Sequence, residues 1–303
     1  MPSSSRRKLR DIRRSYTGED KVSAEAGVGR GDLGLDRCSP QQRRFRAVLA
    51  VYLFNANVPD TPFDTQHSAT AFLSYTMTVS PWFDTFACVV PGAVENVVGR
   101  LLASPGNGDL QYGVPGLRVV AAVDFGTYHL VHLPTGAKMV IARRPDFPPL
   151  SEVQRHGPYG ETWSARHYVG AEIPLAAVEH EALSRLPSMP SGIERILAAL
   201  VTRLDAHDPS DKWAIGMWWY DPLLRPNNQS YRRSHRFVLW GQGPKWELRW
   251  NGWPLPEDVI ACLTAPIIGV PGLAATLRFP PNSGQVFKQL SLRLSGTVRS
   301  TQD

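Results

Sequence analysis

An acidic cluster with one histidine is the group of side chains best suited by residue type to carry chemistry. Its members are Asp205, His207, Asp208 and Asp211. Carboxylate oxygens and an imidazole this close in sequence could bind a hard metal ion or act as general acid and base. The Asp-Pro-Ser-Asp run that closes the cluster is also typical of a turn after a helix. We favour the turn, and keep a hydrolase or metal-dependent enzyme built on these residues as an alternative.

Short motifs elsewhere match known signatures in their letters but not in their context. Gly29, Gly31 and Gly34 have the spacing of a dinucleotide-binding fingerprint, but a charged segment precedes them where that chemistry needs a strand. The Asp-Phe-Gly run at 124–126 lacks the other protein-kinase motifs, and a hairpin turn explains it. The sequence contains no G-x-S-x-G nucleophile elbow and no H-E-x-x-H zinc motif. We therefore expect no cofactor and no metal centre, and lean towards a protein that is not an enzyme.

Positive charge gathers at the amino end of the chain. Residues 1–50 hold twelve Lys or Arg against six Asp or Glu, whereas residues 51–303 hold twenty-one of each. The densest group of basic residues contains only one acidic residue, Asp11, within its span. The basic residues of this group are Arg6, Arg7, Lys8, Arg10, Arg13 and Arg14. Such a density attracts phosphate polymers and acidic protein surfaces. The leading hypothesis is a non-enzymatic binding or adaptor protein that engages an acidic partner, such as nucleic acid, through this basic arm. A solubilising tail without a partner is the alternative.

Tryptophan is concentrated in the C-terminal half. Seven of the nine tryptophans fall within forty-one residues: Trp213, Trp218, Trp219, Trp240, Trp246, Trp250 and Trp253. Arginines are interleaved with them, and we expect Arg232, Arg233 and Arg236 to add to the contact with an acidic partner. Indoles alternating with arginines on a sheet could stack on single-stranded nucleic acid or carbohydrate, but large indoles also fill cores well. We favour the core, and keep a protein–protein interaction module on this Trp-rich sheet as a third hypothesis.

Start signals mark two helices among the elements that would hold these side chains. Ser39, Pro40 and Gln42 supply an N-cap, a first-position proline and a capping-box side chain, and an apolar face follows as far as Leu53. A second Ser-x-x-Glu box at 191–194 predicts a helix that ends near Asp205. Further helices are expected at 94–103, 175–186 and 257–263.

The first thirty-eight residues are expected to form a short helix and a linker. Leu9, Ile12 and Tyr16 recur at helical spacing, which gives the basic segment 6–16 one narrow apolar edge. An edge of this kind needs a surface to dock on, either the body of the protein or a partner. Residues 18–38 show no periodic apolar pattern, so we expect a linker there.

Aromatic and β-branched residues predict strands in both halves of the chain. They are expected at 71–79, 82–90, 117–125, 128–133, 138–143, 213–220, 235–241, 245–251 and 286–298. Ser80-Pro81 should form the turn between the first two. The three strands between residues 117 and 143 are separated by tight turns, so we expect an antiparallel meander.

Together these elements predict an α+β fold with two lobes of antiparallel β-meander and flanking helices, preceded by the basic arm. The segment 145–158 holds four prolines and is the best internal boundary. We therefore expect a basic arm and linker at 1–38, an N-terminal lobe at 39–150 and a C-terminal Trp-rich lobe at 151–303.

The opening RRKLRDIRRSYTGED and the later GDLGLDRCSPQQRRFRAVLAVYLFN resemble the N-terminal segments of uncharacterised proteins of high-GC actinobacteria. The resemblance covers about the first fifty-five residues. It implies no activity, and it assigns no role to any residue of this chain.

Cysteine usage and hydropathy indicate the compartment. Cys38, Cys88 and Cys262 are odd in number and far apart, which argues against a disulfide framework and for a reducing environment. The longest apolar run, Ala47 to Phe54, is much shorter than a membrane span. We therefore expect a cytoplasmic protein without a membrane partner.

Overall fold

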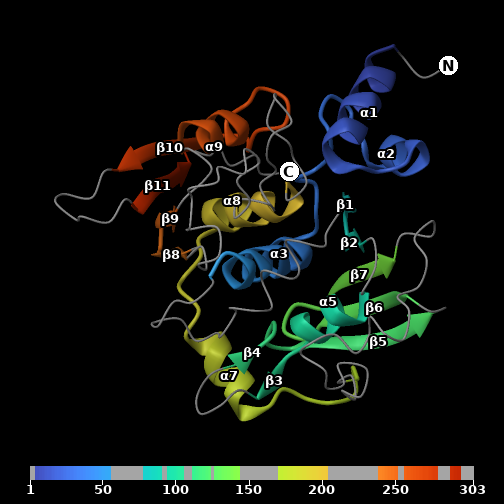
Figure 1. The fold of residues 1–303 in the computed structure, drawn as a ribbon, viewed down its shortest axis with the longest axis vertical. Helices are drawn as coiled ribbons and strands as arrows, with labels where there is room; N and C mark the ends of the chain where they lie inside the picture. The colour runs from blue at the N-terminus through green and yellow to red at the C-terminus, as the bar shows by residue number, and fades with distance from the viewer. Residues whose placement is uncertain are drawn as a thin grey trace, which may run out of the picture.

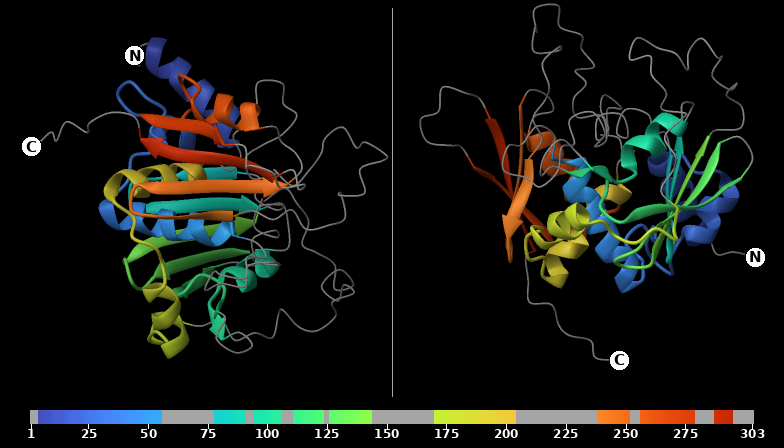
Figure 2. Two further views of the ribbon diagram at one scale, coloured as in Figure 1. Left: turned by 90° about the vertical axis from the view of Figure 1, so that its left-hand side faces the viewer. Right: turned by 90° about the horizontal axis from the view of Figure 1, so that it is seen from below.

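The computed structural model describes residues 4–55, 78–90, 94–105, 111–123, 126–143, 170–203, 238–251, 256–278 and 287–294. Over these ranges the fold is α+β, as the sequence predicts, with two β-sheets on opposite sides of a helical layer (Figure 1, Figure 2). Helices α3 (Pro40–Leu53) and α8 (Ser191–Thr202) make up this layer and pack against each other. Within the same ranges, no helix combines the length and apolar content that a bilayer crossing requires.

One hydrophobic core runs through the parts of the chain that we expected to form separate lobes. Its buried residues come from both helices of the central layer and from both sheets. Helix α3 belongs to the expected N-terminal lobe and α8 to the expected C-terminal lobe. The packing of α3 on α8 therefore joins the two expected lobes. The proline-rich segment 145–158, where we placed the boundary, lies outside the described residues.

The first sheet has five strands in the order β1-β2-β7-β6-β5. Strands β5, β6 and β7 form the expected antiparallel meander. Strand β2 pairs with β7 in parallel, which we did not predict, because parallel partners lie far apart in the chain and no local turn marks them. The bounds are β1 Thr78–Pro81, β2 Thr85–Val90, β5 Leu117–Val123, β6 Thr127–His132 and β7 Ala137–Arg143.

The turn between β1 and β2 lies at residues 82–84, not at Ser80-Pro81 as the sequence suggested. Pro81 is the last residue of β1, an edge strand, and proline is tolerated there because its missing N–H removes no bond from the ladder. The expected extension of this strand back to residue 71 falls outside the described residues.

The second sheet is antiparallel, with the order β10-β11-β9-β8. Trp246 and Leu248 alternate along β9 and are both fully buried, so Trp246 belongs to the core, as we favoured. The strand at 273–278 was not predicted, because Ala274, Ala275 and Thr276 give it only a weak apolar alternation. The bounds are β8 Val238–Gln242, β9 Lys245–Asn251, β10 Leu273–Arg278 and β11 Phe287–Leu294.

Helix α3 begins as predicted: the Ser39 side chain accepts a hydrogen bond from the Gln42 N–H, and Pro40 occupies the first turn. The capping box predicted at 191–194 is wrong, since Pro190 is the N-cap of α8 and no side chain caps that end.

Smaller elements border the two sheets. They are α5 Val94–Leu101, α7 Ala177–Ser184, α9 Pro256–Leu263, and the short ladder of β3 Ser104–Pro105 with β4 Gln111–Tyr112.

The N-terminal region is folded against the body. Helix α1 (Ser4–Thr17) turns its predicted apolar edge, formed by Leu9, Ile12 and Tyr16, onto the core. In place of a linker at 18–38 the structure has helix α2 (Lys21–Gly27), followed by a loop that buries Leu33 and Leu35. The linker prediction was wrong because these apolar residues are too few and too irregular to give a periodic signal.

The last of the three glycines that resemble a dinucleotide fingerprint, Gly34, is required by the backbone. Its φ of 67° lies in the left-handed region, and a Cβ there would lie 2.0 Å from the carbonyl oxygen of Gly27. The segment before the glycines is helix α2, not a strand. This close approach of two backbone segments accounts for the glycine without a nucleotide.

Candidate functional site

Arg13, one of the six cations assigned to the arm, is fully buried inside the fold. Its Nε and NH2 donate to the two carboxylate oxygens of Glu19 at 2.5 and 2.7 Å. Its remaining donors reach the carbonyl oxygens of Gly27 (3.0 Å), Leu33 (2.7 Å) and Pro81 (3.2 Å). Arg13 therefore ties α1 to α2, to the following loop and to the first sheet, and is not available to a partner.

The other five cations of α1 fall into two groups. Arg6 and Arg10 share one carboxylate: the Arg6 Nε lies 3.5 Å and the Arg10 NH1 3.2 Å from the oxygens of Glu25. The second group is exposed, and within the described part of the chain none of its members forms an ion pair; they are Arg7, Lys8 and Arg14. The positive surface of α1 is thus smaller than the sequence suggested.

The remaining predicted site residues cannot be placed. The weak catalytic candidates and the C-terminal arginines lie outside the described residues; they are Asp205, His207, Asp208, Asp211, Arg232, Arg233 and Arg236. Over the residues that are described, no cluster of His, Cys, Asp and Glu side chains could hold a metal ion. An enzyme built on the acidic cluster stays a prediction.

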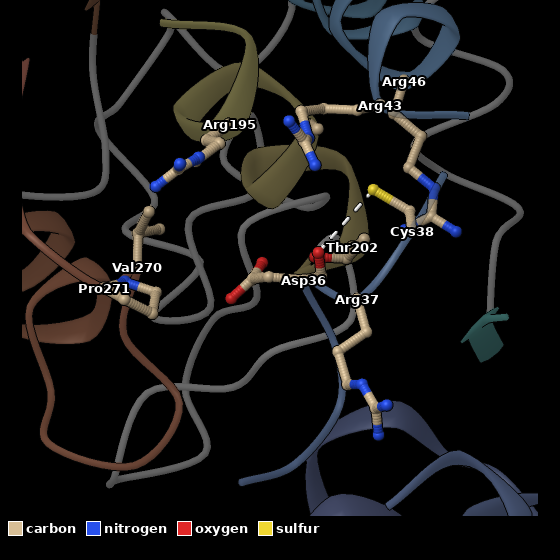
Figure 3. Close-up of a pocket in the computed structure, with 10 residues that line it drawn as sticks. Asp36, Arg37, Cys38, Arg43, Arg46, Arg195, Thr202, Val270 and Pro271 are labelled. Carbon is tan, nitrogen blue, oxygen red and sulfur yellow. Dashed lines mark hydrogen bonds between the residues drawn. The ribbon is translucent and has the colours of Figure 1, made fainter. Parts of the chain in front are cut away.

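A pocket of about 290 Å³, which the sequence did not indicate, opens beside the helical layer (Figure 3). Its walls come from α3 and the loop before it, from α8, and from the loop between α9 and β10. The charged and thiol-bearing lining residues are Asp36, Arg37, Cys38, Arg43, Arg46 and Arg195. The rest of the described lining is Ala198, Thr202, Val270 and Pro271.

The one carboxylate among these lining residues, Asp36, is already neutralised. Arg203 follows α8 and is itself buried, and its NH1 and NH2 donate to the two Asp36 oxygens at 2.6 and 2.7 Å. Arg203 also donates to the carbonyl oxygens of Ile268 (2.5 Å) and Gly269 (2.9 Å). Arg203 thus connects the three walls of the pocket to one another. Because it pairs with Asp36, the remaining lining arginines leave the pocket with excess positive charge.

Arg46 lines the pocket beside Cys38 and is fully buried (Figure 3). Its NH2 donates to the carbonyl oxygens of Trp82 (2.6 Å) and Thr85 (3.3 Å), and its guanidinium carbon lies 5.5 Å from the centre of the Phe86 ring. Nε and NH1 have no hydrogen-bond partner in the structure as described. Burial lowers the pKa of Arg46 to about 10, so the side chain is still charged near neutral pH.

The other arginines of the pocket are more accessible. Figure 3 shows the Arg43 guanidinium projecting from α3 into the space between the helices, whereas Arg195 extends from α8 towards Val270 and Arg37 is turned away from the centre. Cys38 is mostly buried, and its thiol donates to the Asp36 carbonyl oxygen at 3.6 Å. The pocket therefore offers unpaired guanidinium groups around a small cavity, an arrangement suited to an anion.

Sequence reasoning missed this site because its parts come from distant segments. Arg43 and Arg195 line one pocket only because α3 packs on α8, and Val270 comes from a third segment. One signal was present: Arg46 falls among Phe45, Val48 and Leu49, which the pattern assigns to a buried face. An arginine placed there must be buried, and a buried cation calls for an anionic or polar partner.

The chain matches no family model, and no curated protein or solved structure is significantly similar to it.

Proposed function

We propose that the protein binds an acidic partner, and that an anionic group of this partner enters the arginine-lined pocket. The observation that carries the proposal is the charge balance of the pocket. Among the described residues Arg43, Arg46 and Arg195 form no ion pair, and the Asp36 carboxylate, whose charge also acts on Arg46, is hydrogen-bonded to Arg203. Guanidinium groups suit carboxylate and phosphate oxygens, because their donors lie in one plane and remain charged at any physiological pH.

Nucleic acid is the partner that the exposed cations of α1 favour. Arg7, Lys8 and Arg14 present positive charge and form no ion pair among the described residues. Cations spread over a helix surface suit a partner with closely spaced phosphates, and this kind of binding weakens as salt is added. The α1 surface and the pocket would then contribute to the same association.

We expect loss of the two accessible pocket arginines to weaken binding of an acidic probe at least about tenfold, since each charge-assisted hydrogen bond contributes about 1.5–3 kcal/mol. The variant carries Arg43→Gln and Arg195→Gln; Arg195 is exposed and Arg43 is half-buried. Fluorescence anisotropy with a labelled single-stranded oligonucleotide, and separately with a labelled polyglutamate peptide, measures the affinity over a series of salt concentrations.

A charge-matched control separates the pocket from net charge. Arg185→Gln with Arg249→Gln removes two exposed arginines that pair locally with Glu181 and Glu247 and do not line the pocket. This control should bind as the wild type does. Equal binding by the pocket variant and the wild type would remove the pocket from the mechanism, and failure of both probes to bind the wild type would refute an acidic partner.

A further inference from the structure

The geometry points to a more specific ligand for the pocket: a small molecule that carries a doubly charged oxyanion, of the phosphate or phosphate-monoester class. This inference rests on the proposed function, since it names the group that the pocket receives. It also adds to that function, because a ligand of this kind would bind as a free small molecule and not only as part of a macromolecule.

The size of the cavity favours a small ligand. About 290 Å³ is near the lower limit of ordinary small-molecule sites, so the pocket accommodates a phosphate group with a short organic body. The lining has a charged part and an apolar part, as a ligand with a phosphate group and a short organic body requires. Arginines occupy one part, and Ala198, Val270 and Pro271 supply an apolar wall on which carbon atoms could pack.

The charge of the pocket favours a dianion over a monoanion. Three arginines, Arg43, Arg46 and Arg195, line the cavity, and none of them forms an ion pair with a carboxylate among the described residues. The fold leaves Arg46 buried with three N–H groups unused, one on Nε and two on NH1. A buried cation without a counter-ion is unfavourable, and a doubly charged anion above it would offset that cost more fully than a singly charged one.

The backbone of α3 adds to the positive electrostatic potential of the pocket. Cys38 and Arg43 stand on either side of the first turn of α3, whose fourteen residues present the positive end of the helix dipole towards this part of the pocket. The helix end alone would not define a site. Beside a buried, unpartnered arginine it strengthens attraction for the same kind of ligand.

The test is thermal unfolding of the full-length protein with phosphate, glycerol phosphate, sulfate, acetate or chloride at constant ionic strength. We expect a saturable rise in Tm of several degrees with phosphate or sulfate, a smaller rise with acetate and none with chloride. A larger rise with glycerol phosphate identifies a phosphate monoester as the preferred source, and a larger rise with inorganic phosphate identifies the free ion. Phosphate and sulfate also stabilise proteins by exclusion from the surface, but that effect does not saturate.

Variants locate the effect. Arg43→Gln with Arg195→Gln should unfold at the wild-type temperature without phosphate and lose the saturable rise, whereas the control with Arg185→Gln and Arg249→Gln should keep it. Arg46→Met should lose the rise while keeping its stability in phosphate-free buffer, because the buried uncompensated charge is gone. Should Arg46→Met fail to fold, the Arg43 and Arg195 variant still decides the question.

Cys38 supplies a local readout of occupancy, because it lines the pocket and is 8% exposed. Alkylation by the uncharged reagent N-ethylmaleimide, followed by peptide mass spectrometry, should slow several-fold at Cys38 in saturating phosphate. The rate at Cys262, which is buried and does not line the pocket, should not change. A linear response to phosphate that all variants share, or unchanged alkylation of Cys38, would overturn this inference. Oligonucleotide or polyglutamate binding that still depends on Arg43 and Arg195 would leave the proposed function standing.

Discussion

Replacing Arg13 with leucine should lower the free energy of unfolding by about 3–5 kcal/mol, the usual cost of removing one partner from a buried ion pair. The substitution leaves the Glu19 carboxylate, which is 4% exposed, without its charged donor. It also removes the hydrogen bonds that hold the carbonyl oxygens of Gly27, Leu33 and Pro81. Urea unfolding followed by circular dichroism measures the change.

The neighbouring residue provides the control for Arg13. Arg14 is exposed and donates only a long 3.4 Å bond to the Glu19 carbonyl oxygen, so Arg14→Leu should alter stability very little. Adding Glu19→Leu to Arg13→Leu should recover part of the loss, because the Glu19 carboxylate is then no longer left buried without its counter-ion. Equal stability of the Arg13 and Arg14 variants would show that the buried ion pair does not hold the N-terminal region in place.

The behaviour of Arg13 also bears on what an N-terminal run of arginines means. From the sequence, Arg13 and Arg14 are indistinguishable members of one basic segment. The helix turns one inward and the other outward, and the carboxylate that neutralises Arg13 lies in the segment that we expected to be a linker. Charge density along the chain therefore predicted correctly that the surface of α1 is positive, but it overstated the number of cations available to a partner.

Local signals predicted the parts of the fold that depend on neighbouring residues. The cap at Ser39 and the meander from β5 to β7 are of this kind, since a cap and a tight turn act over a few positions. The parallel pairing of β2 with β7 and the packing of α3 on α8 depend on segments far apart in the chain. No pattern within either segment specifies its partner.

The charge of the pocket also depends on contacts between distant segments, which local sequence patterns do not predict. Asp36 and Arg203 are 167 positions apart, and both oxygens of the Asp36 carboxylate accept hydrogen bonds from Arg203, so that Asp36 forms no direct ion pair with Arg43 or Arg46. Without that pair the lining would contain a carboxylate able to compensate one arginine. The capacity of the pocket for an anion thus follows from a long-range contact, which composition and spacing do not reveal.

A second buried ion pair, between Arg118 and Glu179, should make the stability of the protein sensitive to acid. The Glu179 carboxylate accepts hydrogen bonds from Arg118 NH1 (2.9 Å) and NH2 (2.6 Å) and from the backbone N–H groups of Gly116 (2.7 Å) and Ala176 (2.8 Å). Burial by itself raises the pKa of Glu179, but these hydrogen bonds outweigh burial and hold the pKa below its usual value. The contacts join α7 to the start of β5.

A lowered pKa in the folded state means that the unfolded chain binds the proton more readily. The stabilisation is therefore complete at pH values above the unfolded pKa, and is lost as the pH falls through the folded pKa. Replacing Glu179 with glutamine should cost about 3–5 kcal/mol above roughly pH 5, because Arg118 is left buried without its counter-ion. The difference from wild type should shrink below roughly pH 4, where Glu179 becomes protonated in the unfolded wild-type chain.

Urea unfolding of the wild type and the Glu179→Gln variant across this pH range tests the prediction. Glu181→Gln is the matched control, since Glu181 lies on the same helix, is exposed, and pairs only with Arg185 one turn away. Its stability should follow the wild type at every pH, because an exposed pair of this kind contributes little. A cost of Glu179→Gln that stays constant with pH would indicate that the shape of the side chain, and not its negative charge, joins α7 to the first sheet.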